Sequence, residues 1–364
     1  MISSFEKEVM ADLLKQAALL RGRFFINPLV AAAVIKNNTV ISIGVHQGEG
    51  SAHAEVIALK KAGEKARGAT LLCTLEPCTH YGKTAPCNLA IRKAGIARVV
   101  YAIKDPNPKV SAENGDKLFQ SEGIVVESGV LSTEAWYLND AFFTCIKTKR
   151  PFITAKVAQS YDHKIPISTG DIRYITNKKS LYKVHQIRRE NQAIVTGIGT
   201  ILTDNPSLTV RYNLLETIYH NPDIFILDSK LKTPVDAKVI TETTRRKIFI
   251  FTSIDTSRKS YPQHVEVITV STINGGLNLT EVLNIAYARS YFQLLLETGP
   301  TLLNSFLAQN FIDKLELFIA NKKSELTDIS SPFSMDSTQV SSLFEIKSKE
   351  NLDGDIHLTC YLNN

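Results

Sequence analysis

Four residues between positions 53 and 87 have the types and spacing of a metal-dependent hydrolytic site. His53 and Glu55 are two residues apart, and Cys78 and Cys87 follow nine residues from each other. One imidazole and two thiolates provide three protein ligands, the number with which a catalytic zinc keeps its fourth position open for water. We therefore predict that His53, Cys78 and Cys87 hold zinc, and that Glu55 carries protons beside it.

The order of these residues fits the H-x-E…P-C-x-x-C signature of zinc base deaminases, except that eight residues separate the two cysteines. The alternative is a capping or core histidine with two buried apolar cysteines. Four residue types in the expected order favour the metal site. The other three cysteines lie outside this pattern, and we interpret them as core thiols: Cys73, Cys145 and Cys360.

Two short helices must position the ligands. The first is predicted over residues 54–62, so that His53 and Glu55 both stand at its first turn. The second is predicted over residues 88–94, between Pro86 and Gly95, which is the expected order of proline and glycine around a helix. A thiol at a helix N-terminus has a lowered pKa, so we expect Cys87, like Cys78, to be a thiolate.

Composition limits the class of protein. A chain of 364 residues with 44% hydrophobic residues predicts two globular domains. The net charge of +6 is dispersed over 42 basic and 36 acidic residues, which disfavours a nucleic-acid stripe but suits a small anionic substrate. No apolar run approaches the roughly 20 residues of a membrane span. An acidic N-terminus and an odd number of cysteines favour a reducing cytoplasm.

Strands alternating with helices predict an α/β layer in each half of the chain. We place the domain boundary before Pro151, with domains 1–148 and 149–364. In the first half we predict helices over residues 5–20, 115–122 and 133–149, a hairpin over 29–35 and 39–45, and strands over 69–75, 97–103 and 124–126. In the second we predict strands over 152–158, 193–196, 223–227, 247–251, 265–269, 291–296 and 314–319, and helices over 178–190, 279–289 and 301–310.

Two glycine turns in the second half could receive phosphate. Gly299 stands before the predicted helix 301–310, and backbone N–H groups at a helix N-terminus suit a nucleotide phosphate. Gly197 and Gly199 supply only half of a dinucleotide fingerprint, because Leu202 occupies the third glycine position. A plain strand–helix connection remains the alternative at both turns.

Over nearly its whole length the chain resembles the bifunctional riboflavin-biosynthesis deaminase/reductase family. The long gap between the cysteines is typical of that family and separates the chain from cytidine and tRNA deaminases. The resemblance rests on residues 27–30, 44–46, 50–55, 76–87 and 105–108 in the first half, and on residues 160–164, 174–176, 197–211 and 297–302 in the second.

The resemblance implies a cytidine-deaminase-like N-terminal domain followed by a dihydrofolate-reductase-like C-terminal domain. The first would carry out zinc-hydroxide hydrolytic deamination of 2,5-diamino-6-(5-phosphoribosylamino)pyrimidin-4(3H)-one. Zinc lowers the pKa of bound water to about 7, and Glu55 would take the water proton and return it to the ring and the leaving ammonia. The second domain would reduce the ribosyl chain to ribityl with NADPH.

The resemblance also assigns binding residues. Asn27 and His46 would hold the pyrimidine; the alternative is a turn asparagine and a solvated histidine. The NADPH contacts would be Ala158, Tyr174, Thr200, Asp204, Gly299, Pro300, Thr301, Leu302, Leu303, Asn304 and Ser305. The substrate contacts of the reductase would be Lys156, Arg188, Leu208, Arg211 and Glu297. The two arginines make physical sense because a guanidinium fork matches a phosphate.

Departures from the family pattern concentrate in the second half. His163 stands where the family usually has glycine, Tyr174 replaces a tryptophan, and Ile172 replaces a polar residue. One alternative is therefore a deaminase whose reductase-like half only binds nucleotide or supports the homo-oligomer that we expect. A nucleic-acid-editing deaminase is a third hypothesis, which the dispersed charge disfavours.

Overall fold

The chain folds into two compact units, Met1–Lys149 and Arg150–Asn364, each of which we describe by itself. The computed structural model describes residues 1–25, 27–79, 81, 85–108, 115–165, 175–211, 221–242, 245–254, 260–323 and 343–363. Within these ranges, every helix is too short or too polar to span a bilayer.

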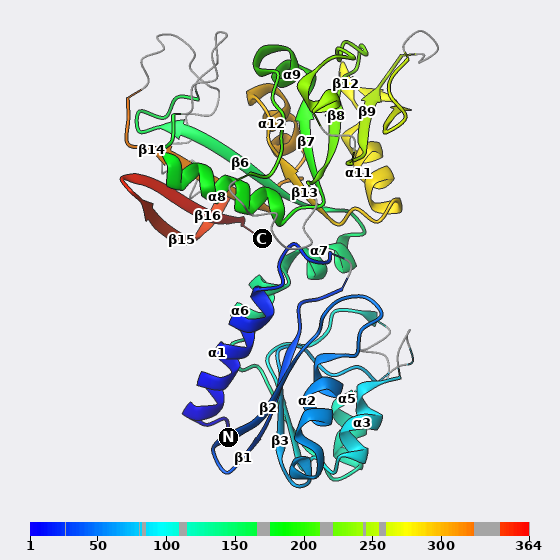
Figure 1. The fold of residues 1–364 in the computed structure, drawn as a ribbon, viewed down its shortest axis with the longest axis vertical. Coiled ribbons are helices and arrows are strands. Elements are labelled where there is room, and N and C mark those ends of the chain that lie inside the picture. Colours follow the sequence, from blue (N-terminus) through cyan, green and yellow to red (C-terminus); the bar gives the residue numbers. More distant parts are fainter. Residues whose placement is uncertain are drawn as a thin grey trace. The chain divides into compact units, whose positions relative to one another are not determined.

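A five-stranded mixed sheet forms the centre of the first unit (Figure 1). Its strand order is β2-β1-β3-β4-β5; β1 pairs antiparallel with β2 and β3, whereas β3, β4 and β5 run parallel. The strands are β1 (Ala31–Lys36), β2 (Thr39–Val45), β3 (Thr70–Cys73), β4 (Arg98–Tyr101) and β5 (Val125–Ser128). The helices are α1 (Ser4–Ala18), α2 (Ala54–Ala62), η1 (Gly63–Ala66), α3 (Cys87–Lys93), α5 (Gly115–Ser121), α6 (Ser132–Leu138) and α7 (Asp140–Thr148).

Apolar side chains point to both faces of this sheet, so a hydrophobic core lies on each face. Ala31 and Ala33 of β1 face a cluster that includes α1 and α6, because successive side chains point to opposite faces. Ala32 and Val34 face the other cluster, to which α2, α3 and α5 contribute. The predicted hairpin is confirmed as the antiparallel β1–β2 pair.

The helix predicted over residues 133–149 is wrong in one respect. It is broken at Asn139, where φ is −120°, into α6 and α7. The Asn139 side chain accepts a hydrogen bond from the Leu29 N–H (2.7 Å) and donates one to the Leu29 carbonyl (3.0 Å). These buried bonds connect segments 110 residues apart, so helical periodicity gives no sign of the break.

The second unit has a nine-stranded sheet in the order β10-β9-β8-β7-β13-β6-β14-β16-β15. The strands are β6 (Phe152–Ser160), β7 (Ala193–Gly197), β8 (Asp223–Leu227), β9 (Ile248–Thr252), β10 (Val265–Thr269), β13 (Gln293–Leu296), β14 (Lys314–Ala320), β15 (Phe344–Leu352) and β16 (Asp355–Leu362). The helices are α8 (Lys178–Arg189), α9 (Ile198–Asp204), α10 (Lys238–Thr241), α11 (Leu279–Ala288) and α12 (Pro300–Ala308). A small separate hairpin pairs β11 (Thr272–Ile273) with β12 (Gly276–Leu277).

Helices cover both faces of this sheet. Leu283 of α11 and Phe306 of α12 pack into the core on one face. Val184 of α8, Ile201 of α9 and Val239 of α10 pack into the core on the other. Four central parallel strands, β7, β8, β9 and β13, are buried on both sides and are nearly continuous apolar runs, which is why their positions could be predicted from sequence.

The order of the strands brings three strand ends together. From β6 the chain moves to β7, β8, β9 and β10, then returns to place β13 between β6 and β7. The carboxyl ends of β6, β7 and β13 therefore lie at a point where the winding direction reverses, which is where open α/β sheets bind ligands. The antiparallel strands β15 and β16, which our predictions missed, extend the sheet beyond β14; β15 is mostly exposed and lacks an apolar run.

Candidate active sites

The three predicted ligands of the first unit converge. His53 is the N-cap of α2, Cys87 is the first residue of α3, and Cys78 lies in the loop after β3. The His53 Nδ1 atom lies 3.1 Å from the Cys87 Sγ atom and 3.4 Å from the Cys78 Sγ atom. All three candidate ligand atoms lie within 4.8 Å of one another, so they can share one ion.

A glycine lets α2 approach the sheet. A Cβ atom at Gly44 of β2 would lie 2.1 Å from the Ala54 carbonyl oxygen and 2.6 Å from the Ala58 N–H nitrogen. Only glycine therefore fits beneath the first turn of α2 at this spacing. That close contact fixes the end of the helix that carries His53 and Glu55.

The two thiols differ in their proton affinity. The Cys87 thiol and the His53 ring both donate hydrogen bonds to the Cys78 sulfur, and these bonds lower the pKa of Cys78 to about 4. The Cys87 backbone N–H also donates to the Cys78 sulfur, at 3.4 Å. The pKa of Cys87 is raised, because its thiol donates to Cys78 and is fully buried. Without a metal ion, the neighbouring Cys78 charge and burial therefore outweigh the helix N-terminus at Cys87. That both cysteines are thiolates when they hold zinc stays a prediction.

Glu55 lies in the first turn of α2 and is 3% exposed. Its Oε2 atom has no hydrogen-bond partner among the described residues. Burial and the neighbouring Cys78 thiolate raise the pKa of Glu55 to about 7. A carboxyl group with a pKa close to neutral can both accept and donate a proton under ordinary conditions.

The donor set fits zinc. A tetrahedral zinc ion with bond lengths of about 2.0–2.3 Å separates its ligand atoms by about 3.5 Å, close to the spacing of His53 from the two sulfurs. Three protein ligands leave one position for water or substrate. The unpartnered Oε2 atom of Glu55 supplies the acceptor that such a position requires beside it.

Asn27 and His46 form a connected pair. The His46 Nε2 atom lies 3.1 Å from the Asn27 Nδ2 atom, and its Nδ1 atom lies 3.1 Å from the Ala52 carbonyl oxygen. His46 is buried, and its ring lies edge-on to the ring of His53 at 5.7 Å. Burial lowers the pKa of His46. The alternative of a solvated histidine is therefore wrong, and the pair stands beside the metal ligands.

The second unit contains a cavity of about 1520 Å³ at the strand ends described above. This volume exceeds the 300–1,000 Å³ typical of a pocket for one small ligand. The predicted reductase residues that line it are Lys156, Ala158, Arg188, Thr200, Asp204, Leu208, Arg211, Glu297, Gly299, Pro300, Thr301, Leu302, Leu303 and Ser305. Asn304 is not among the lining residues, and Tyr174 and Ile172 lie outside the described part of the chain.

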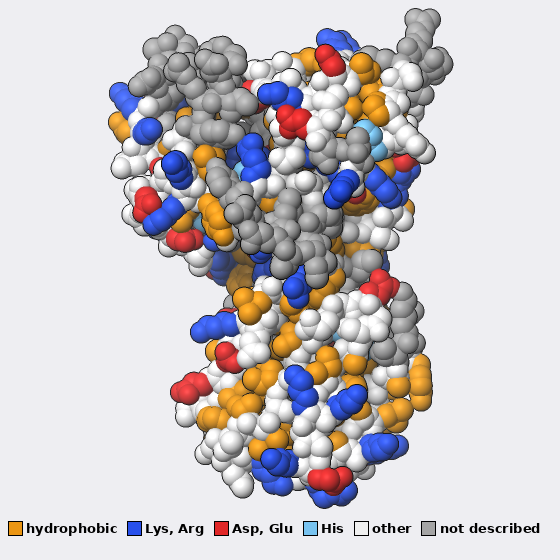
Figure 2. Space-filling view, viewed as in Figure 1, with side chains coloured by type: hydrophobic (Ala, Val, Ile, Leu, Met, Phe, Trp, Pro, Cys, Tyr) orange, Lys and Arg blue, Asp and Glu red, His pale blue; other side chains and the backbone are white. Residues whose placement is uncertain are grey.

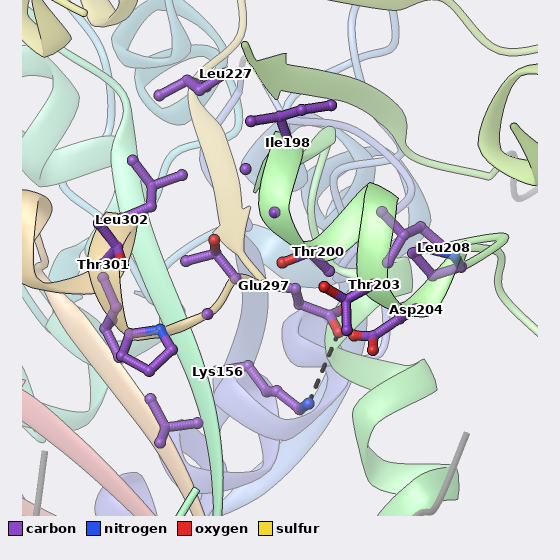
Figure 3. A pocket seen from close by; sticks show the side chains of 18 of the residues that line it. Lys156, Ile198, Thr200, Thr203, Asp204, Leu208, Leu227, Glu297, Thr301 and Leu302 are labelled. Carbon is purple, nitrogen blue, oxygen red and sulfur yellow. Dashed lines mark ion pairs between the residues drawn. The ribbon is translucent and has the colours of Figure 1, made fainter. Parts of the chain in front are cut away.

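Charged groups gather at one end of the cavity. Figure 3 shows the Lys156 amine directed at Glu297, with Thr200 and Asp204 of α9 nearby. The Lys156 Nζ atom lies 3.8 Å from the Glu297 Oε2 atom, and Arg188 forms a bidentate pair with the same carboxylate. Burial would raise the pKa of Glu297, but the charges of Arg188 and Lys156 hold it at about 2. The carboxylate is therefore ionised throughout the physiological range.

Two helix N-termini also face the cavity. Gly299 is the N-cap of α12 and Pro300 its first residue; a Cβ at Gly299 would meet no atom within 4 Å. A Cβ at Gly197 would lie 3.3 Å from the Thr298 Oγ1 atom and 3.4 Å from the Leu302 Cδ2 atom of α12, so this glycine allows β7 and α12 to approach closely. Open N–H groups at a helix start suit the pyrophosphate of a dinucleotide, and NADPH fits this part of the cavity. α9, which begins directly after Gly197, was missed by our predictions.

Several residues at these sites were not predicted. Ser51 lies 3.2 Å from the His46 Nδ1 atom through its hydroxyl. Leu227 and Ser229 line the cavity at the carboxyl end of β8. Because ligands bind at the carboxyl ends of parallel strands, the predicted strand 223–227 could have indicated these two residues. His185 lines it from α8, and no motif marks it.

Known proteins match both units. The profile of the cytidine and deoxycytidylate deaminase zinc-binding region matches residues 4–103, and that of the RibD C-terminal domain matches residues 151–323. The riboflavin biosynthesis protein RibD of Aquifex aeolicus is 41% identical over 323 residues, 88% of this chain and 88% of that protein. A Thermotoga maritima diaminohydroxyphosphoribosylaminopyrimidine deaminase/5-amino-6-(5-phosphoribosylamino)uracil reductase has a TM-score of 0.80 at 33% identity, over 98% of this chain and 99% of that one. Acinetobacter baumannii RibD, form 1, has a TM-score of 0.79 at 29% identity, over 99% of this chain and 100% of that one.

The fold and the two sites define a two-unit enzyme that joins a zinc-dependent deaminase to a reductase, and the predicted fold class is confirmed. The chain belongs to the RibD family of riboflavin biosynthesis proteins.

Proposed function

We propose that this chain catalyses both reactions named for its relative from Thermotoga maritima. The first unit would deaminate diaminohydroxyphosphoribosylaminopyrimidine, and the second would reduce the product, 5-amino-6-(5-phosphoribosylamino)uracil, with NADPH. The observation that carries the proposal is the convergence of His53, Cys78 and Cys87 beside the buried Glu55. The second unit has a separate large cavity lined by Lys156 and other charged groups, which provides a site for the reduction that follows deamination.

In the deaminase unit, zinc held by His53, Cys78 and Cys87 would supply a water molecule of lowered pKa. Glu55 would take one proton from that water and pass it to a ring nitrogen; it would then take the remaining proton of the added hydroxyl group and pass it to the departing amino group, which leaves as ammonia. A carboxyl pKa near 7 suits both steps. Asn27, aligned by His46, holds the pyrimidine ring through its side-chain amide.

In the reductase unit, NADPH would supply the hydride, with its phosphates at the N-terminus of α12. Arg211 binds the phosphate of the substrate. Arg188 holds Glu297, and Glu297 in turn holds the Lys156 amine beside the ribosyl chain. Because these groups surround one cavity, an active reductase is favoured over a half that only binds nucleotide.

We also propose a cytoplasmic homo-oligomer that acts on a small molecule and not on nucleic acid. All five cysteines are free thiols, which suits a reducing compartment. On the face drawn in Figure 2, the described lysine and arginine side chains are scattered among other types. Light scattering tests the oligomer, and salt-dependent RNA binding would contradict the small-molecule assignment.

The test uses the full chain loaded with zinc. Incubation with the diamino substrate should release ammonia without NADPH, and adding NADPH should then cause its oxidation. Ammonia release without later NADPH oxidation would restrict the function to deamination. The absence of both ammonia release and NADPH oxidation would contradict the proposal.

A further inference from the structure

Residues 205–211, hereafter the 205–211 segment, form an irregular stretch of chain after α9. Two of its residues have left-handed backbone angles: Asn205 (φ 39°) and Leu208 (φ 49°). Leucine rarely adopts this conformation, so surrounding contacts must maintain it. Leu208 and Arg211 of this segment line the cavity of the second unit.

Arg246 holds the middle of the segment from behind. Its Nη2 atom donates to the Ser207 carbonyl at 2.6 Å, and its Nη1 atom donates to the Leu208 carbonyl at 3.0 Å. Nη2 also donates to the carbonyl of Val239, in α10, at 2.9 Å. Arg246 itself does not line the cavity, so its contribution reaches the site through the 205–211 segment and through α10, whose Lys238 also lines the cavity.

The rest of the segment is held by side chains as well. The Thr209 carbonyl accepts from Arg188 (3.0 Å), the Val210 N–H donates to Asn221 (2.6 Å), and the Arg211 N–H donates to the His185 Nδ1 atom (2.9 Å). At the other end the Asn205 Oδ1 atom accepts from the Lys238 N–H at 2.9 Å. These hydrogen bonds, together with those from Arg246, hold six of the seven residues of the segment: Asn205 and residues 207–211.

The position of Arg246 is costly. The residue is 2% exposed, and burial lowers its pKa to about 10. Its Nε atom has no partner among the described residues. One reason for a protein to keep a buried cation at such a cost is that its hydrogen bonds fix a conformation that an apolar side chain would not. Here they fix two consecutive carbonyl groups next to a left-handed leucine.

We propose that Arg246 is a positioning residue of the reductase: by holding the Ser207 and Leu208 carbonyls it presents Leu208 and Arg211 to the phosphorylated substrate. This inference rests on the proposed reductase function. Leu208 and Arg211 contact the substrate in the ground state and in the transition state alike. Losing Arg246 therefore weakens the binding of both states to the same extent. Uniform loss raises KM and leaves kcat nearly unchanged.

The test compares R246M and R246K with the wild-type full chain, using the deaminated substrate and NADPH. R246M should raise the KM for that substrate by about tenfold or more, because it removes two buried charged hydrogen bonds to the segment. R246K should have an intermediate KM, since it retains the charge without the fork. The kcat, the KM for NADPH and ammonia release by the first unit should each stay within about threefold.

R289M is the matched control. Arg289 also makes two short hydrogen bonds, to Glu266 at 2.7 and 2.6 Å, but it lies away from the cavity. Its KM should equal that of the wild type. A merely structural role for Arg246 predicts a lower unfolding temperature and less active enzyme, with an unchanged KM, and that result would overturn the inference.

If R246M does not fold, R246K decides: an unchanged KM in that variant also overturns the inference. A wild-type protein that oxidises no NADPH would instead refute the proposed reductase function, and so the two failures are distinguishable.

Discussion

Arg188 and Glu297 form a bidentate ion pair although they lie 109 residues apart in the chain, with the Nε–Oε1 distance at 2.6 Å and the Nη2–Oε2 distance at 2.9 Å. Both side chains are largely buried, and the Glu297 carboxylate also lies 3.8 Å from the Lys156 amine. The pair connects α8 to the end of β13 and fixes the charged end of the cavity.

Glu297→Gln should destabilise the second unit by about 3–5 kcal/mol, since it leaves Arg188 buried without its partner charge. Reductase activity should fall by at least about tenfold, while ammonia release is retained. Urea unfolding followed by circular dichroism measures the first effect; Trp136, the only tryptophan, reports on the first unit alone.

Glu266→Gln is the control for that variant. Glu266 pairs with Arg289 at an exposed position, where ion pairs contribute less than about 1 kcal/mol. Equal unfolding midpoints for the Glu297 and Glu266 variants would mean that the buried pair does not form.

His185 should make the stability of the second unit depend on pH. Burial and the cations Arg188 and Arg211 lower the pKa of His185 to about 4, so the folded state holds the ring neutral while the unfolded state protonates near pH 6.5. Stability is therefore complete above pH 6.5 and is lost as pH falls toward 4, by about 2–3 kcal/mol.

His185→Asn preserves an acceptor near the Arg211 N–H and removes the titration. Between pH 7 and 4.5, the loss of unfolding free energy should be about 2 kcal/mol smaller in this variant than in the wild type. Parallel pH profiles for the two proteins would show that His185 is not held neutral.

Asn139 should matter for deamination although it lies outside the site. Its side chain hydrogen-bonds both the N–H and the carbonyl group of Leu29, which is two residues after Asn27. Asn139→Ala leaves two buried backbone groups unpaired, which should cost about 2–4 kcal/mol in the first unit. Trp136 fluorescence during urea unfolding measures this. The KM for the diamino substrate should rise and the reductase KM should not; a rise in both would contradict a local role.

Cys78→Ser should abolish zinc binding, because two remaining ligands hold zinc poorly and a serine hydroxyl is not deprotonated as the thiol is. Metal analysis of the purified protein measures the zinc content directly. Cys145→Ser, a change at a buried cysteine outside the metal-ligand cluster, should keep one equivalent. Full zinc content in the Cys78 variant would remove that residue from the ligand set.

Local patterns were sufficient to predict much of the scaffold. His53 at the start of α2 and the apolar runs of β8 and β9 follow from short-range sequence signals. The contacts that complete the sites are long-range. Asn139 meets Leu29 across 110 residues and Arg246 meets Leu208 across 38, and no local pattern indicates either pairing.

The protonation of the two cysteines shows the same limit. Sequence places Cys87 at a helix start, but only the structure shows that it donates to Cys78 and is buried with Glu55. Similarly, α9 was missed because Gly197 and Gly199 weaken a helix signal, whereas the close approach of Gly197 to Thr298 explains why a glycine stands there.

Glu55→Gln offers the sharpest test of the central claim, that three converging ligands and one buried carboxyl group perform the deamination. The zinc-loaded variant should keep its metal and its reductase activity, and its ammonia release should fall by about 10²–10⁴-fold. Ammonia release at the wild-type rate, from a variant with full zinc content, would contradict the role of Glu55 and the mechanism built on it.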